Sequence, residues 1–63
     1  MATYILQHRT TDNEITETSV HNVFDFHVTA GKIVEFLDQK GNVLFRIPTT
    51  DVISVQQILD HIL

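Results

Sequence analysis

The chain has 63 residues, no cysteine and a formal charge of −4, with eight acidic against four basic residues. A chain of this length forms one domain and buries only about 60% of its unfolded surface, so tight packing or self-association must stabilise it. The lack of cysteine excludes disulfides, thiolate metal sites and a cysteine nucleophile. We therefore expect a single small domain over residues 1–63, and the apolar strand faces described below favour self-association.

The charge pattern argues against a nucleic-acid or membrane partner. Phosphate binding draws on clustered Lys and Arg, and the basic residues are scattered along the chain. The longest apolar runs are three residues, far short of the ~20 residues that cross a bilayer. The first residues also lack the basic and apolar regions of a signal peptide. We expect a cytoplasmic protein. The basic residues are Arg9, Lys32, Lys40 and Arg46.

Three segments precede the middle of the chain. Residues 3–9 alternate loosely between apolar and polar side chains, which predicts a first strand. Residues 10–14 have turn chemistry, with Asn13 suited to a left-handed conformation. Residues 15–20 are rich in Thr and Glu, as in a solvated edge strand. His21 and Asn22 then mark a bulge or a break before the next strand.

Two glycines, Gly31 and Gly41, each close a tight-hairpin signal between apolar segments. Both sit where a type I turn passes to a left-handed residue, a position that favours Gly because it has no Cβ. The pattern predicts a three-stranded meander over residues 23–28, 32–37 and 43–47. With three-residue turns, the predicted cross-strand pairs are His27–Ile33, Phe26–Val34, Asp25–Glu35, Phe24–Phe36, Leu37–Val43, Phe36–Leu44 and Glu35–Phe45.

This register divides the meander into two faces, because directly opposed residues share a face. One face is a continuous apolar surface and the predicted core; it carries Phe24, Phe26, Val28, Val34, Phe36 and Leu44. The other face joins a polar strand to an apolar one, and an exposed apolar patch commonly marks an interaction site. The predicted partner or oligomer interface on that second face is Ile33, Leu37, Val43, Phe45 and Ile47.

The last segment changes period after Pro48, which cannot donate to a strand ladder. Thr50 or Asp51 can cap a helix, and the apolar positions from Val52 onward, except Ile53, fall within an arc of about 140° at helical spacing. This pattern favours a helix over residues 51–62. The competing interpretation is a further strand over residues 52–55, which are rich in β-branched side chains.

The predicted fold is therefore α+β: a small antiparallel β-meander or open barrel of about five strands with a C-terminal helix. Its predicted core contains Tyr4 or Ile5, Leu6, Phe24, Phe26, Val34, Phe36, Leu44, Val55 and Leu59.

One group of side chains could carry chemistry. Asp25, His27 and Glu35 converge on one face of the predicted register, as in a His/carboxylate metal site or an acid–base dyad. The alternative is an exposed face with solvated charges, which is the interpretation we favour. His8 is expected at the surface. No nucleophile elbow, P-loop or dinucleotide fingerprint is present. We expect no cofactor, no resident metal and no enzymatic activity.

The leading hypothesis is a small non-catalytic protein-interaction or regulatory module, an accessory factor of a bacterium or phage. It would act as a homo-oligomer, with a dimer favoured, and through a protein partner on the second sheet face. The alternative is a small barrel, of the general OB or Sm-like kind, that binds single-stranded nucleic acid or a small ligand. That alternative is an analogy of architecture, which does not establish function.

Overall fold

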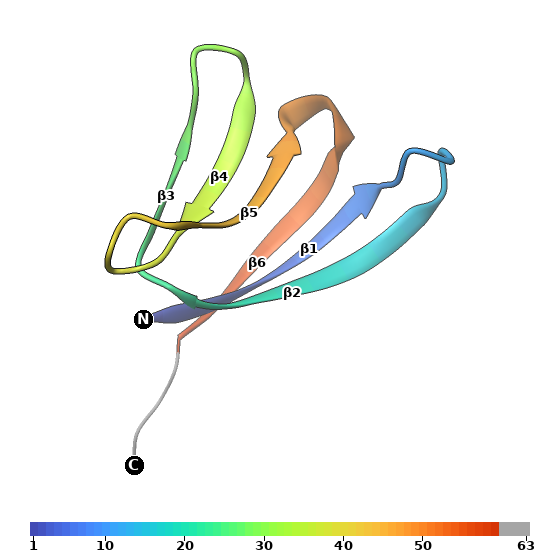
Figure 1. Ribbon diagram of the computed structural model, residues 1–63. Helices are drawn as coiled ribbons and strands as arrows, with labels where there is room; N and C mark the ends of the chain where they lie inside the picture. Colours follow the sequence, from blue (N-terminus) through green and yellow to red (C-terminus); the bar gives the residue numbers. More distant parts are fainter. Residues whose placement is uncertain (60–63) are drawn as a thin grey trace.

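The computed structural model describes residues 1–59, and this part of the chain is all-β (Figure 1). Sheet A has the strand order β2-β1-β6 and sheet B the order β3-β4-β5, and every pairing is antiparallel. No helix in residues 1–59 is long and apolar enough to cross a membrane. The elements are β1 (Ala2–Arg9), β2 (Ile15–Val23), β3 (Asp25–Val28), β4 (Ile33–Leu37), β5 (Val43–Pro48), the 3-10 turn η1 (Thr49–Asp51) and β6 (Val52–Leu59).

The predicted C-terminal helix is wrong, and with it the α+β class. The predicted five-stranded meander or open barrel is also wrong, because six strands form two separate three-stranded sheets. β6 occupies most of the segment predicted as a helix and pairs with the edge of β1 that β2 leaves open. A β-bulge explains the helix-like spacing: Val52 lies opposite His8 and Val55 opposite Leu6, because Ile53 is an extra residue between them. Apolar residues three apart thus share a face within a strand. The competing strand interpretation was correct and extends to Leu59, while residues 60–62 of the predicted helix lie outside the described residues.

The two sheets cross through aromatic contacts made by β1. The Tyr4 ring lies 5.5 Å from that of Phe26 in β3 and 5.1 Å from that of Phe36 in β4. Further along β1, the His8 ring lies 5.8 Å from that of Phe45 in β5. β1 therefore runs across all three strands of sheet B. The sheets are joined by the bend between β2 and β3 and by η1 between β5 and β6 (Figure 1).

The core lies between the sheets, and the sequence predicts it in part. Leu6 and Phe36 are its most deeply buried large side chains, and both were predicted, as was Tyr4. Val34 is partly buried and packs against this cluster. The prediction is wrong for Phe24, Phe26, Leu44 and Val55, which are 41–61% exposed; the side chain of Leu59 lies outside the described set. The buried cluster is Ala2, Tyr4, Leu6, Val20, Val23, Phe36 and Ile47.

The three hairpin turns share one geometry. In each, the N–H of the first residue donates to the carbonyl four residues on, and the fourth residue is left-handed. The side chain of the first residue also accepts the N–H of the fifth, which is the local bonding expected of Thr and Asp in turns. The first residues are Thr10, Thr29 and Asp38, and the left-handed residues are Asn13 (φ 62°), Lys32 (φ 61°) and Gly41 (φ 85°).

The left-handed positions confirm some predictions and correct one. Asn13 and Gly41 are left-handed as predicted, and Asn22 (φ 61°) forms the predicted bulge between β1 and β2. In the β3–β4 turn, however, the left-handed residue is Lys32 and not Gly31. β2 also lies at an edge of sheet A and is mostly exposed, as predicted for the Thr-rich strand.

These turns correct the predicted register of sheet B. Because the β3–β4 turn lies one residue later than predicted, Phe26 pairs with Phe36, two positions from the predicted Val34. The β4–β5 register begins as predicted, with Leu37 opposite Val43, and then shifts by one at Leu44. The bulge at Leu44 turns the rest of β5 over, so that its odd-numbered side chains face the core.

We expect alanine at the two glycines to have opposite effects. Gly41→Ala lowers the free energy of unfolding by about 1 kcal/mol, because a Cβ is disfavoured at positive φ, although nothing lies within 4 Å of it. Gly31→Ala raises it by about 0.5 kcal/mol by restricting the unfolded chain, since the added Cβ meets only the Thr29 Oγ1 at 3.8 Å. Urea denaturation of both variants measures the difference. Equal losses would contradict the assignment of the left-handed residue to Lys32.

Candidate interaction surface

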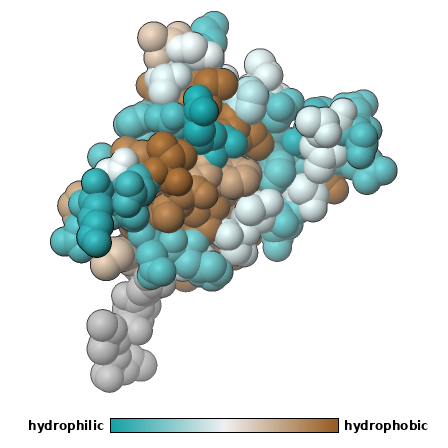
Figure 2. Space-filling model, in the orientation of Figure 1, coloured by the Kyte–Doolittle hydropathy of each residue, from teal (hydrophilic) through white to brown (hydrophobic). Residues whose placement is uncertain are grey.

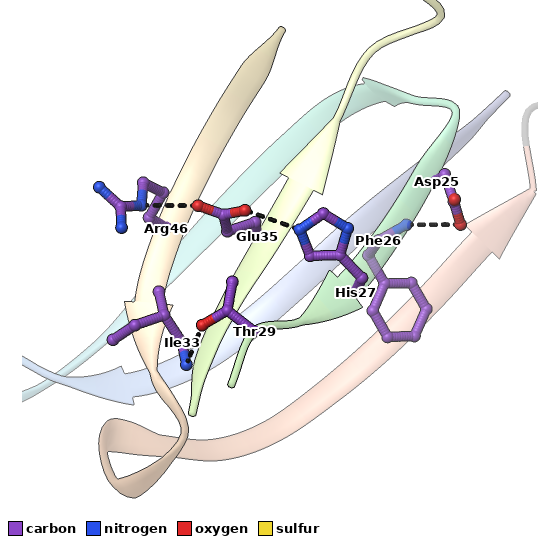
Figure 3. A network of polar contacts seen from close by, with 7 residues as sticks. All are labelled: Asp25, Phe26, His27, Thr29, Ile33, Glu35 and Arg46. Atoms are coloured by element: carbon purple, nitrogen blue, oxygen red, sulfur yellow. Dashed lines mark hydrogen bonds and ion pairs between the residues drawn. The ribbon is translucent and has the colours of Figure 1, made fainter. Parts of the chain in front are cut away.

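A row of charged and polar side chains crosses the outer face of sheet B (Figure 3). Glu35 of β4 lies opposite His27 of β3 and Arg46 of β5, so the three share a face. Its Oε1 is 2.7 Å from His27 Nε2, and its Oε2 accepts from Arg46 Nε at 2.9 Å. The flanking side chains leave the Glu35 side chain only 15% exposed. We call His27, Glu35 and Arg46 the charge row.

Asp25 does not join this row. It was predicted to oppose Glu35, but it lies opposite Leu37, and its Oδ1 accepts the N–H of Phe26 at 2.8 Å. Glu35 instead pairs with Arg46 and, when the imidazole is protonated, with His27. Within residues 1–59, no three or more His, Asp or Glu side chains are placed to hold a metal ion.

The five residues of the predicted interface lie on two faces of sheet B. Ile33, Leu37 and Val43 are on the outer face with the charge row, and Val43 is 47% exposed. The bulge at Leu44 turns Phe45 and Ile47 inward: Ile47 is buried, and Phe45 packs against the core. The predicted patch is thus divided by the sheet, and no more than three of its five members share an outer surface. Their role as an interface stays a prediction.

More exposed apolar side chains lie on two edge strands, β3 and β6, than on the predicted interface. The sequence predicts several of these side chains to lie in the core. β3 is an edge of sheet B and β6 an edge of sheet A. Phe26 and Val55 lie opposite the core residues Phe36 and Leu6, so both face inward, yet each is 47% exposed. An inward side chain on an edge strand is covered from one side only. The Phe24-x-Phe26-x-Val28 alternation signalled this surface, but it is equally typical of a core strand.

The hydropathy of the surface agrees with this exposure. Figure 2 shows apolar side chains gathered in the middle of the view, framed by polar ones. Ten large apolar side chains in residues 1–58 are 41–65% exposed: Met1, Ile15, Phe24, Phe26, Val28, Val43, Leu44, Ile53, Val55 and Ile58. Exposed apolar patches on soluble proteins commonly mark interaction sites.

His8 is a buried polar side chain and not the surface residue that we predicted. It is 8% exposed, its Nε2 lies 2.8 Å from the Thr18 Oγ1, and its Nδ1 lies 3.1 Å from the Arg9 carbonyl. A neutral ring protonated on Nδ1 donates to that carbonyl and accepts from the Thr18 hydroxyl. Since both nitrogens have partners, His8 serves the packing between β1, β2 and β5.

The β4–β5 turn borders an open depression lined by Met1, Asn22, Asp38, Gln39, Lys40 and Asn42. The Asp38 carboxylate accepts from the N–H groups of Lys40 and Asn42. The Asn42 N–H has the largest effect and lowers the pKa of Asp38; desolvation opposes it, and the Asn42 amide, the Lys40 N–H and the Lys40 charge lower it further. The turn thus accounts for Asp38 without a ligand.

Comparisons with protein-family models, with curated proteins and with solved structures find no match to this chain.

We expect the charge row to contribute a small coupling energy. A double-mutant cycle of Glu35→Gln with Arg46→Gln should give about 0.5 kcal/mol, because the Arg46 side chain is 61% exposed and such pairs are screened by solvent. Urea denaturation of the four proteins measures it. The control cycle, Glu17→Gln with Arg46→Gln, should give zero, because Glu17 lies on β2 in the other sheet. A coupling within error of zero in the first cycle would contradict the prediction.

The Asp38 turn predicts a pH effect with a definite sign. Because folding lowers the pKa of this carboxyl, its stabilisation is present above the unfolded pKa of about 4 and is lost as the pH falls through the folded pKa. Asp38→Asn keeps an acceptor oxygen but does not titrate. The Tm of the wild type should therefore fall relative to that of Asp38→Asn between about pH 5 and pH 2. Parallel Tm profiles would show that the turn does not depend on the ionised carboxylate.

Proposed function

We propose that this chain is a small non-catalytic protein-interaction module that acts through self-association and binds a protein partner through its exposed apolar edge strands. The observation that carries the proposal is the half-exposure of inward-facing side chains on β3 and β6. Phe26, Val28 and Val55 face the core side of their sheets, and they are 47%, 55% and 47% exposed. A second protein surface would complete their burial.

The small size of the domain supports the same proposal. Chains of about 60 residues bury too little surface for large stability and are often stabilised by oligomerisation when disulfides and metals are lacking. This chain has no cysteine. Burying apolar side chains that are already ordered stabilises the folded state by mass action, because the partner binds only that state.

Charge supports a protein partner over nucleic acid. The chain is acidic overall, and Arg46, one of its four basic residues, is paired with Glu35. The remaining basic side chains lie on β1 and on two separate turns, so they do not form the stripe that follows a phosphate backbone. An acidic interaction module of this kind fits the cytoplasmic compartment that the sequence predicts.

Self-association tests the proposal directly. Sedimentation velocity between about 1 µM and about 500 µM should show a concentration-dependent shift from monomer to dimer, with a Kd of roughly 10–100 µM, as expected for an interface below the standard size. Apolar contacts should make the dimer persist at high salt. A monomer throughout that range would contradict the self-association on which the proposal depends.

A further inference from the structure

The charge row ends at a free strand edge. Arg46 of β5, Glu35 of β4 and His27 of β3 follow one another across sheet B with alternating sign when His27 is protonated. β3 has no strand on its other side. A strand added there would place one side chain directly beside His27, and an acidic residue at that place would continue the alternation.

We propose that a second copy of this chain adds to the edge of β3 in antiparallel register, with the twofold axis at Phe26 and with Asp25 of the second copy beside His27. This inference rests on the proposed self-association and identifies its surface and register. The two copies then form one continuous sheet, β5-β4-β3 followed by β3-β4-β5, as in other cases of strand addition. Two equivalent charge rows cross the junction, each lengthened by the carboxylate of the other copy.

The sequence of β3 is self-complementary in this register. With Phe26 opposite Phe26 of the second copy, Asp25 falls opposite His27 and Phe24 opposite Val28. The Asp25–His27 pairs lie on the outer face with the charge row, and Phe26 lies on the inner face. Phe24 precedes β3, and its N–H already donates to the Leu37 carbonyl of its own sheet at 2.8 Å, so the pairing between copies is centred on residues 25–27. An isologous contact requires this kind of self-complementarity, because each residue meets its partner twice. The three apolar residues are those left 47–61% exposed in one copy.

The backbone of β3 also suits this pairing. Thr29 donates its N–H to the Ile33 carbonyl, so by strand alternation Phe26 and Val28 direct their backbone groups away from β4. The N–H of Phe26 is taken by the Asp25 carboxylate at 2.8 Å, and Asp25 makes no ion pair within the described residues. On pairing, the Phe26 N–H donates to the carbonyl of the second copy, and Asp25 is released to His27. Asp25 thus protects the edge in the monomer and binds across it in the dimer.

The edge strand β6 does not specify a partner in this way. Its eight residues, VISVQQIL, include no charged side chain that could set a register. The apolar area at β3 is small: two phenylalanines that are 61% and 47% exposed offer roughly 200 Å² per copy, at about 200 Å² for a whole aromatic side chain. The charge pairs therefore have to provide the specificity, and β6 offers none.

Two matched valine substitutions test which edge associates. Val28 and Val55 are both inward-facing and about half exposed, one on each edge strand. Val28→Lys should raise the dimer Kd at least tenfold by sedimentation velocity, whereas Val55→Lys, with the same change of charge, should alter it less than about twofold. Circular dichroism checks that both variants are folded. The reverse ranking would overturn the β3 interface but leave the proposed self-association standing, and a monomeric wild type would remove both.

Single cysteines test the register, since the chain contains none of its own. Position 25 faces position 27 of the second copy, so an equimolar mixture of Asp25→Cys and His27→Cys should form a disulfide dimer at least fivefold faster than either variant alone. Non-reducing electrophoresis during mild oxidation measures the rates. Equal rates in the mixture and in the separate variants, in a protein that dimerises, would overturn the register. This test stands even if Val28→Lys fails to fold.

Discussion

The left-handed residue at the fourth position of each hairpin turn is the constraint on which the rest of the structure depends. It fixes where the turn ends, and each strand pairing is counted from that residue. With Lys32 left-handed, Glu35 lies opposite His27. Had the left-handed residue been Gly31, Glu35 would have lain opposite Asp25, and two carboxylates would have faced each other. A single dihedral angle thus decides whether the outer face of sheet B carries an attraction or a repulsion.

The turns set which residues are paired across the strands, and the bulges set which face of the sheet each side chain lies on. The extra residue Leu44 turns Phe45 and Ile47 of β5 toward the core, and the extra residue Ile53 places Val52 and Val55 on one face of β6. Each bulge converts a spacing of two into a spacing of three. The second one explains why Val52 and Val55 have a helix-like spacing although this segment pairs with β1 as a strand.

The left-handed turn residues and the bulges explain which features the sequence could predict and which it could not. The three-stranded meander, the left-handed Asn13 and Gly41 and the bulge at Asn22 follow from local chemistry and were predicted. The left-handed Lys32 was not, because Lys has no preference for positive φ and a glycine stands beside it. The core was predicted at Leu6 and Phe36, which lie in central strands, and wrongly at Phe26 and Val55, which lie in edge strands. Strand order follows from long-range pairing, so no local pattern reveals which apolar strand is an edge.

An edge strand with exposed apolar side chains is a hazard that proteins usually counter with charge or with bulges. In β3, Asp25 and His27 both oppose pairing with an unrelated strand and favour pairing with a second copy. The Asp25 carboxylate occupies the Phe26 N–H, so an unrelated strand must displace an anion and leave it without a cation. A second copy in the proposed register instead offers His27, whose Nε2 already lies 2.7 Å from Glu35 Oε1. The barrier to pairing would then be low for a second copy and high for an unrelated strand. A surface of only about 200 Å² per copy would therefore be selective although its affinity is modest.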